Sequence, residues 1–280
     1  QHTPIKLRRL GPMIGMAAVI RWCVPRVTKP AYVWLMGIAV EVCAGSAGEI
    51  EAAHRSGADS VEVCTWLSAG GVTPSWGLVS SALVHPGLRT RVLVRPGPGG
   101  FHYGKLEKQV ILADLDHFVG SGVHGIVVGA LMEDGSVDHA FIREVLGRCK
   151  GVEVTFHRAI DQANDLRSAF DACLDLGIQR VLTSGGRSLA LDGRDQLAWM
   201  VDRAAGRVIV AAAGGISPNT VVELVQHTGV PEVHFAAQRQ LAGDNTLASL
   251  ASKSAPLGAL EADEDKIAAM IGALKSLSRP

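Results

Sequence analysis

Two identical tetrapeptides, Val-Glu-Val-Cys, end at Cys43 and at Cys64 and combine residue types that carry acid–base or metal chemistry. Because side chains alternate along a strand, Glu41 shares a face with Cys43, and Glu62 shares a face with Cys64. If the two copies align in register on adjacent parallel strands, about 4.8 Å apart, the thiols lie side by side and suit Cu(I), which prefers soft ligands. The same spacing permits a disulfide or the plain packing of two small side chains, so these alternatives stay open.

Further polar side chains close the later strand-like segments. Buried glutamates need partners, and we expect Arg95, His157 and Arg158 to supply them. With a pKa raised by burial, Glu41 or Glu62 is a candidate general acid or base, and His157 is a candidate proton shuttle. A buried ion-pair layer that only organises the core is the structural alternative. The candidate substrate-binding residues are Arg95, Arg158, Thr183, Ser184, Gly214, Gly215 and His234.

A pair of glycines, Gly214 and Gly215, follows the seventh strand-like segment and precedes a helix start expected at Ser217. Exposed backbone N–H groups at such a place can receive an anion, and the loops after strands seven and eight are the usual phosphate position in a barrel. A tight turn alone also uses paired glycines, so an anion site and a simple turn remain equally compatible with this segment.

The candidates stand at the ends of short β-branched segments that alternate with Ala-, Leu- and charge-rich stretches of helical character. This alternation predicts parallel strands joined by right-handed crossovers, and a (β/α)8 TIM barrel formed as a single domain by residues 37–280. A doubly wound sheet is disfavoured because no GxGxxG or Walker sequence follows a strand. In a barrel, the residues that close the strands gather at one face. The predicted strands are 37–43, 60–64, 91–96, 125–130, 152–158, 180–186, 207–215 and 232–237.

Charge and cysteine content narrow the classes of function. The formal net charge is zero, but residues 1–40 carry six basic side chains and no acidic one, which leaves 21 basic and 27 acidic side chains in the remainder. An acidic body gives no reason to expect nucleic-acid binding. Five cysteines without a CxxC pattern favour a reducing, cytoplasmic location, and no uncharged apolar run approaches the about 20 residues of a membrane helix. Residues 1–36 are expected to be a basic, poorly ordered N-terminal extension, with a transit-like segment as the alternative.

Taken together, these segments resemble the CutC family, and the resemblance covers residues 37–237. It is carried by the ordered motifs EVCAGS, SGADSVEVC, GGVTPSWG, GALMEDGSVD, VTFHRAID, RVLTSGG and AAAGGIS. The resemblance implies a TIM barrel that is cytosolic and often a homo-oligomer, with Cu(I) bound at Cys43 and Cys64. The family is associated with copper homeostasis, although this role is disputed, and no reaction is firmly attached to it. The chain departs from the family pattern at Gly97, Gly100 and Phe235, which puts substrate contacts near Arg95 and His234 in doubt.

Two functions therefore follow from the sequence. The first is a copper homeostasis protein that binds Cu(I) at the barrel mouth through Cys43 and Cys64, without turnover. The alternative is an enzyme of unassigned reaction that uses Glu41, Glu62 and His157 on a small anionic or phosphorylated metabolite. In either case, the expected partners are a metal or small-molecule ligand and further copies of the chain, with no nucleic acid and no membrane.

Overall fold

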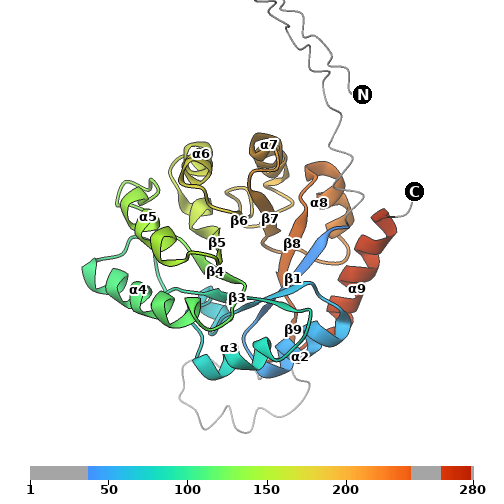
Figure 1. Ribbon diagram of the computed structural model, residues 1–280. Helices are drawn as coiled ribbons and strands as arrows, with labels where there is room; N and C mark the ends of the chain where they lie inside the picture. The colour runs from blue at the N-terminus through green and yellow to red at the C-terminus, as the bar shows by residue number, and fades with distance from the viewer. Residues whose placement is uncertain (1–36, 241–259, 279–280) are drawn as a thin grey trace, which may run out of the picture. The chain divides into compact units, whose positions relative to one another are not determined.

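Eight parallel strands close into a barrel in the computed structural model of the chain, which describes residues 37–240 and 260–278 (Figure 1). Each predicted strand segment overlaps one observed strand, so the predicted barrel is confirmed. The predicted extension, residues 1–36, lies outside the described residues. The barrel strands are β1 (Ala39–Ala44), β2 (Ser60–Val63), β3 (Arg89–Leu93), β4 (Gly125–Val128), β5 (Glu153–Phe156), β6 (Arg180–Thr183), β7 (Ile209–Ala213) and β8 (Glu232–Ala236).

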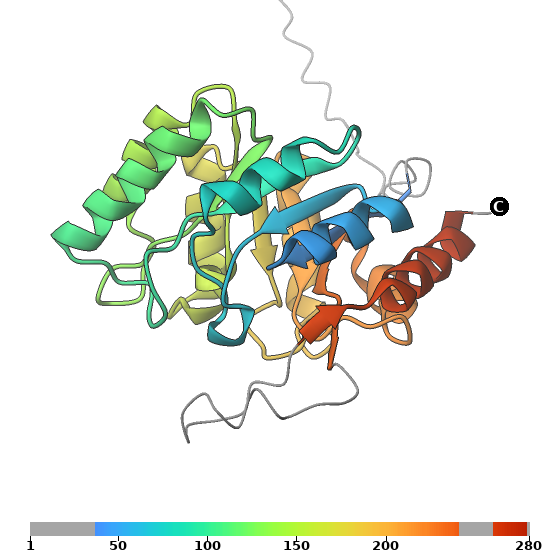
Figure 2. The ribbon, with the colours of Figure 1, turned by 90° about the horizontal axis from the view of Figure 1, so that it is seen from below.

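Helices surround the strands, and α2 and α9, from opposite ends of the described chain, lie side by side and complete the ring (Figures 1 and 2). The α-helices are α2 (Ala47–Ser56), α3 (Trp76–Leu83), α4 (Lys105–Val119), α5 (His139–Arg148), α6 (Leu166–Leu176), α7 (Arg194–Ala204), α8 (Val221–Thr228) and α9 (Glu264–Lys275). Short 3₁₀ turns occupy η1 (Leu67–Ala69), η2 (Arg158–Gln162) and η3 (Ser276–Ser278). An antiparallel pair, β9 (Gln238–Gln240) and β10 (Leu260–Ala262), stands between β8 and α9.

Local sequence signals explain where the helices begin and end. The Ser46 hydroxyl accepts a hydrogen bond from the backbone N–H of Glu49 and so caps the first turn of α2. Gly57, Gly177 and Gly229 end α2, α6 and α8 in the left-handed conformation that glycine adopts without steric cost. A glycine at this position is a local signal for the end of a helix.

Strand register decides which side chains meet inside the barrel. The two Val-Glu-Val-Cys copies do not align: Cys43 pairs with Glu62, and Glu41 pairs with Ser60. The expected alignment is therefore wrong by two residues, because strands must stagger to close a barrel. A shift of two keeps the alternation intact, so Cys43, Glu62 and Cys64 still face the interior.

The outward faces of the strands form the main hydrophobic core with the helices. Val42, Val61 and Ile126 are fully buried there, as are Ile50 of α2 and Ile111 of α4. The barrel interior is different, because its apolar residues are few and charged side chains fill the space between them. Within the described residues, no helix is both long enough and apolar enough to cross a membrane.

Candidate functional site

A buried layer of four charged side chains fills the middle of the barrel. We call Glu41, Arg91, Arg180 and Glu232 the ion layer. Arg180 Nη2 lies 2.5 Å from Glu41 Oε1 and 2.7 Å from Glu232 Oε1, and Arg91 Nη1 lies 2.5 Å from Glu41 Oε2 and 3.0 Å from Glu232 Oε1. Glu41 and Arg180 are completely buried. The layer matches two carboxylates with two guanidinium groups, as buried charges require.

The ion layer fixes the ionisation of Glu41. Burial opposes the charged form, but Arg180 and then Arg91 outweigh it, and a hydrogen bond with His234 adds to them, so the pKa of Glu41 lies well below its usual value. The expectation of a raised pKa at Glu41 is therefore wrong. The expected partners Arg95, His157 and Arg158 are also wrong for this residue.

The other members of the ion layer were not predicted, because the predicted site residues all stand at the carboxyl ends of strands. Arg91 lies within β3, and Arg180 and Glu232 are the first residues of β6 and β8. The alternation of side chains gave a usable signal, since Arg91 lies four residues before Arg95 and therefore shares its inward parity.

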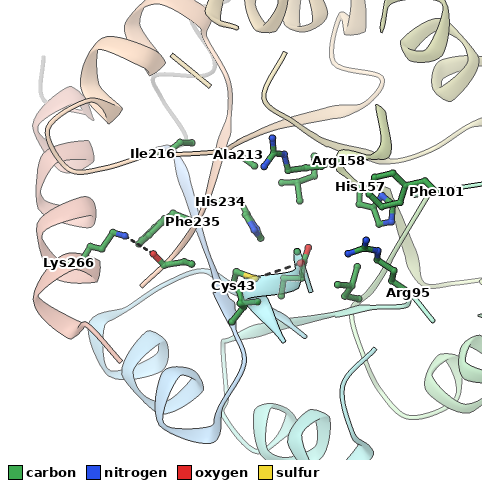
Figure 3. Close-up of a pocket in the computed structure, with 18 residues that line it drawn as sticks. Cys43, Arg95, Phe101, His157, Arg158, Ala213, Ile216, His234, Phe235 and Lys266 are labelled. Atoms are coloured by element: carbon green, nitrogen blue, oxygen red, sulfur yellow. Dashed lines mark hydrogen bonds between the residues drawn. The ribbon is translucent and has the colours of Figure 1, made fainter. Parts of the chain in front are cut away.

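Above the ion layer, at the carboxyl ends of the strands, a cavity of about 360 Å³ opens at the barrel mouth. Figure 3 shows Arg95, Phe101 and His157 grouped on one side and Lys266 with Phe235 on the opposite side. Among the sequence-predicted residues, the cavity brings together Cys43, Glu62, Arg95, His157, Arg158, Gly214, Gly215 and His234. Glu41, Cys64, Thr183 and Ser184 do not line it.

Two thiols meet beside the cavity: Cys43 lines it, and Cys64 is fully buried next to Cys43. Cys43 Sγ lies 3.4 Å from Cys64 Sγ and 3.8 Å from Glu62 Oε1. The hydrogen bond with Cys64, followed by burial, raises the pKa of the Cys43 thiol well above its usual value. Leu93 and Val127 pack around the pair. The Cys43 thiol is therefore protonated at neutral pH until something displaces its proton.

Glu62 differs from Glu41 in its surroundings. Burial raises the pKa of Glu62. The charges of His234, Arg180 and Arg91 lower this pKa, but they offset only part of the effect of burial. Its Oε2 atom has no hydrogen-bond partner among the described residues. The ligand atoms of Cys43, Cys64 and Glu62 lie within 4.8 Å of one another and could hold a soft metal ion. Glu41, Glu62 and His234 also lie this close, but Glu41 is already paired with two arginines.

His157 is held in one tautomer. Its Nδ1 accepts a hydrogen bond of 3.1 Å from the backbone N–H of Ala159, so the neutral ring carries its proton on Nε2. Burial and then the nearby Arg95 charge lower the pKa of His157 to about 3. Nε2 has no partner among the described residues. At neutral pH, His157 is therefore a neutral ring in the cavity wall with a buried Nε2 donor, whereas the expected proton shuttle needs a ring that titrates near neutral pH.

Arg95 is anchored by backbone oxygens. Its Nη1 donates to the carbonyls of Ala69 and Gly71 at 3.2 and 2.8 Å, and its Nη2 donates to that of Gly99 at 2.7 Å. The guanidinium lies 4.9 Å from the centre of the Phe101 ring, within the range of a cation–π contact. Its Nε is buried and lacks a partner within the described part of the chain. Arg95 is thus a rigid cation whose Nε has no acceptor at hydrogen-bond distance among the described residues, while the Tyr103 hydroxyl is near enough to interact with the guanidinium.

Thr183 and Ser184 donate hydrogen bonds to the carboxylate of Asp161, which was not among the predicted site residues. The Thr183 hydroxyl donates to Asp161 at 2.6 Å, and the Ser184 N–H and hydroxyl donate to Asp161 at 3.0 and 2.9 Å. Asp161 in turn accepts from Arg158 Nε at 3.0 Å, and Arg158 Nη2 donates to the Ser184 hydroxyl at 2.9 Å. Both predicted substrate contacts therefore position Arg158. The spacing of Asp161 three residues after Arg158 was the available signal.

The glycine turn, Gly214–Ile216, passes beside Arg158. Gly214 and Gly215 have φ angles of 103° and 64°, a left-handed region that favours glycine. A Cβ atom on Gly214 would lie 3.5 Å from Arg158 Nη2. The backbone N–H groups of Gly215 and Ile216 have no acceptor among the described residues, whereas the register of β7 on β8 directs the Gly214 N–H toward the His234 carbonyl. The helix start expected at Ser217 is wrong, because three residues of turn intervene before α8 begins at Val221.

Comparisons with known proteins agree with this architecture. The CutC family profile matches residues 38–239. A CutC family protein from Agrobacterium fabrum is 38% identical over 195 residues, which cover 70% of this chain and 77% of the relative. The human copper homeostasis protein cutC homolog is 37% identical over 202 residues, with 72% and 74% covered.

Solved structures show the same fold. A copper homeostasis protein CutC from Streptococcus agalactiae superposes with a TM-score of 0.67 at 27% identity, covering 70% of this chain and 97% of that one. Thiamine phosphate pyrophosphorylase from Pyrococcus furiosus superposes with a TM-score of 0.52 at 14% identity, covering 86% and 96%. At that identity, the second likeness shows the barrel fold alone.

Proposed function

Because this chain belongs to the CutC family, we propose that it binds Cu(I) at the barrel mouth through Cys43 and Cys64. One observation carries the proposal: the two sulfur atoms lie 3.4 Å apart, and one of them belongs to Cys43, which lines the cavity. The human and streptococcal relatives are named for copper homeostasis, which supports the choice of metal. The donor set supports it as well, since thiolates are soft ligands that select Cu(I).

The surroundings of the thiols suit a metal that must be kept from water. Leu67 and Leu93 line the cavity beside Cys43. Glu62 Oε1, 3.8 Å from Cys43 Sγ, is placed as a weaker third donor. Binding would release thiol protons, because the thiolate is the ligand form.

A competition experiment tests this function. Cu(I) is held by a chromophoric chelator under anaerobic, reducing conditions, and the protein is titrated against it. We expect Cys43→Ser and Cys64→Ser each to lose most of the affinity, whereas Cys149→Ser, a buried thiol outside the barrel interior, retains it. Equal, weak affinity in the wild type and in both mouth variants rules the proposal out.

A second candidate function is favoured by the free carboxyl oxygen in the cavity. Glu62 Oε2 is buried and has no hydrogen-bond partner in the described part of the chain, and burial raises the pKa of Glu62. Such a carboxyl group can act as a general acid or base on a bound organic molecule. His157 and Arg95 would then stabilise a negatively charged oxygen, since both present N–H donors there.

Metabolite turnover tests this second function. Pools of small anionic metabolites are incubated with the wild type and with Glu62→Gln, and consumption is followed by mass spectrometry. The Gln side chain keeps the shape of a neutral carboxyl but cannot transfer its proton. A metabolite consumed equally by both proteins excludes Glu62 as the acid or base.

A further inference from the structure

We propose that the cavity binds a small phosphate monoester at two points. The phosphoryl group lies at the glycine turn and Arg158, and a hydroxyl or carbonyl oxygen of the same molecule accepts from His157 Nε2 and Arg95 Nε. This inference rests on the second proposed function, because it assigns an organic ligand to the cavity. It does not depend on copper.

The phosphoryl end is built from backbone donors and a cation. Two successive N–H groups of the glycine turn, those of Gly215 and Ile216, have no acceptor among the described residues, and successive backbone N–H groups of this kind form anion sites. Arg158 approaches the same turn, as the 3.5 Å separation between its Nη2 and a Cβ on Gly214 shows. Figure 3 places Ala213, Ile216 and Arg158 on one wall of the cavity.

Hydrogen bonds fix the orientation of the Arg158 guanidinium beside the glycine turn. Asp161 and Ser184 take its Nε and Nη2 hydrogen bonds, which fixes the plane of the guanidinium. Asp161 itself is satisfied by donors from Thr183, Ser184 and Gly186, so its charge is shared among several groups. No described residue accepts a hydrogen bond from Arg158 Nη1, which leaves this nitrogen available for contact with a phosphate oxygen.

The oxygen end is built from two buried donors that nothing in the described chain satisfies. A buried N–H group without an acceptor is rare in proteins, and two that line one cavity point to a ligand atom. Because His157 Nδ1 is occupied by the Ala159 N–H, Nε2 can only donate in the neutral ring. The partner atom must therefore be an acceptor, such as a hydroxyl or carbonyl oxygen.

Charge and size set the class of ligand. The cavity walls carry Arg95, Arg158 and Lys266, whose Nζ donates to the carbonyl of Ala236, and Glu62 is the one acidic side chain among the described lining residues. A phosphate monoester, which carries between one and two negative charges at neutral pH, complements this excess. A volume of about 360 Å³ is at the low end of ligand pockets and fits a small metabolite.

Calorimetry with matched probes tests the two-point assignment. The probes are glycerol 3-phosphate, ribose 5-phosphate and glucose 6-phosphate, each compared with its dephosphorylated form and with inorganic phosphate. At least one ester should bind more tightly than both of its fragments. If no ester binds more tightly than inorganic phosphate, the two-point assignment is overturned, whatever the result with copper.

Variants separate the two ends. Arg158→Ala should weaken ester binding about tenfold to a hundredfold, the effect of losing a hydrogen bond to a charged group. Arg203→Ala is the matched control, since Arg203 is similarly exposed, 49% against 42%, and also pairs with an aspartate, away from the cavity. Unchanged ester affinity in Arg158→Ala contradicts the proposal.

At the oxygen end, His157→Asn keeps an acceptor for the Ala159 N–H and removes the Nε2 donor, whereas His157→Gln places a donor near the Nε2 position. Ester binding should fall in the first and recover in part in the second. Equal binding by wild type and His157→Asn, with the fold verified by circular dichroism, excludes this end of the site. Cu(I) affinity should be unchanged in Arg158→Ala, so that failure here is distinguishable from failure of the copper proposal.

Discussion

Replacing Arg180 with methionine should destabilise the barrel strongly and in a pH-dependent way. Arg180 is fully buried and donates to Glu41, Glu232 and Thr155 at 2.5, 2.7 and 3.3 Å. The methionine fills much of the volume but leaves two buried carboxylates to share Arg91. The variant therefore isolates the electrostatic role of the ion layer from its packing.

The expected magnitude follows from the lost contacts. Breaking a buried ion pair by removing one partner costs about 3–5 kcal/mol, because the remaining charge is uncompensated. Two lost hydrogen bonds between charged groups, at about 1.5–3 kcal/mol each, give a similar figure. With a urea m-value of about 3 kcal/mol/M for a chain of this size, the midpoint of unfolding should fall by about 1–2 M.

Urea unfolding at several pH values checks this prediction. In the wild type, the pKa of Glu41 lies below its unfolded value, so its contribution to stability is present above about pH 4.3 and is lost as the pH falls further. In Arg180→Met, one carboxylate that has lost its arginine partner should have a pKa above its unfolded value. The loss in free energy of unfolding caused by the substitution should therefore become smaller on acidification. The difference in free energy of unfolding between the wild type and Arg180→Met should narrow from pH 7 to pH 5. A gap of under about 1 kcal/mol at pH 7, or one that widens on acidification, refutes the reasoning.

The other predictions concern the cavity. Cu(I) affinity should rise from pH 6 to pH 8, because the raised pKa of Cys43 means that binding displaces a proton; a pH-independent affinity in the chelator competition contradicts this. The imidazole resonances of His157 should not titrate between pH 5 and pH 8 in NMR spectra, since its pKa is lowered to about 3; a midpoint inside that range disproves the assigned neutral donor. Asp161→Asn should lower the free energy of unfolding by about 1–3 kcal/mol in urea titrations and weaken ester binding, because a charged acceptor of several donors is lost. Full ester affinity in this variant shows that Arg158 needs no support from Asp161.

Local patterns in the sequence were sufficient for the architecture. β-branched segments mark the eight strands, and glycines at 57, 177 and 229 mark helix ends, because backbone preference and side-chain alternation are properties of neighbouring residues. The same alternation put Glu41 with Cys43 and Glu62 with Cys64 on one face of their strands, and in the structure these side chains are buried inside the barrel.

Tertiary structure alone decided which inward side chains meet. Arg180 and Glu41 are 139 residues apart, and Arg91 and Glu232 are 141 apart, yet each pair is in contact. The stagger of β1 against β2 paired Cys43 with Glu62 and still left the two sulfurs 3.4 Å apart. The opposite directions of the pKa shifts of Glu41 and Glu62 follow from these neighbours and from no feature of their shared tetrapeptide. Register and barrel closure depend on contacts among all eight strands. The sequence of one strand therefore does not specify how far its neighbours are shifted along the barrel axis.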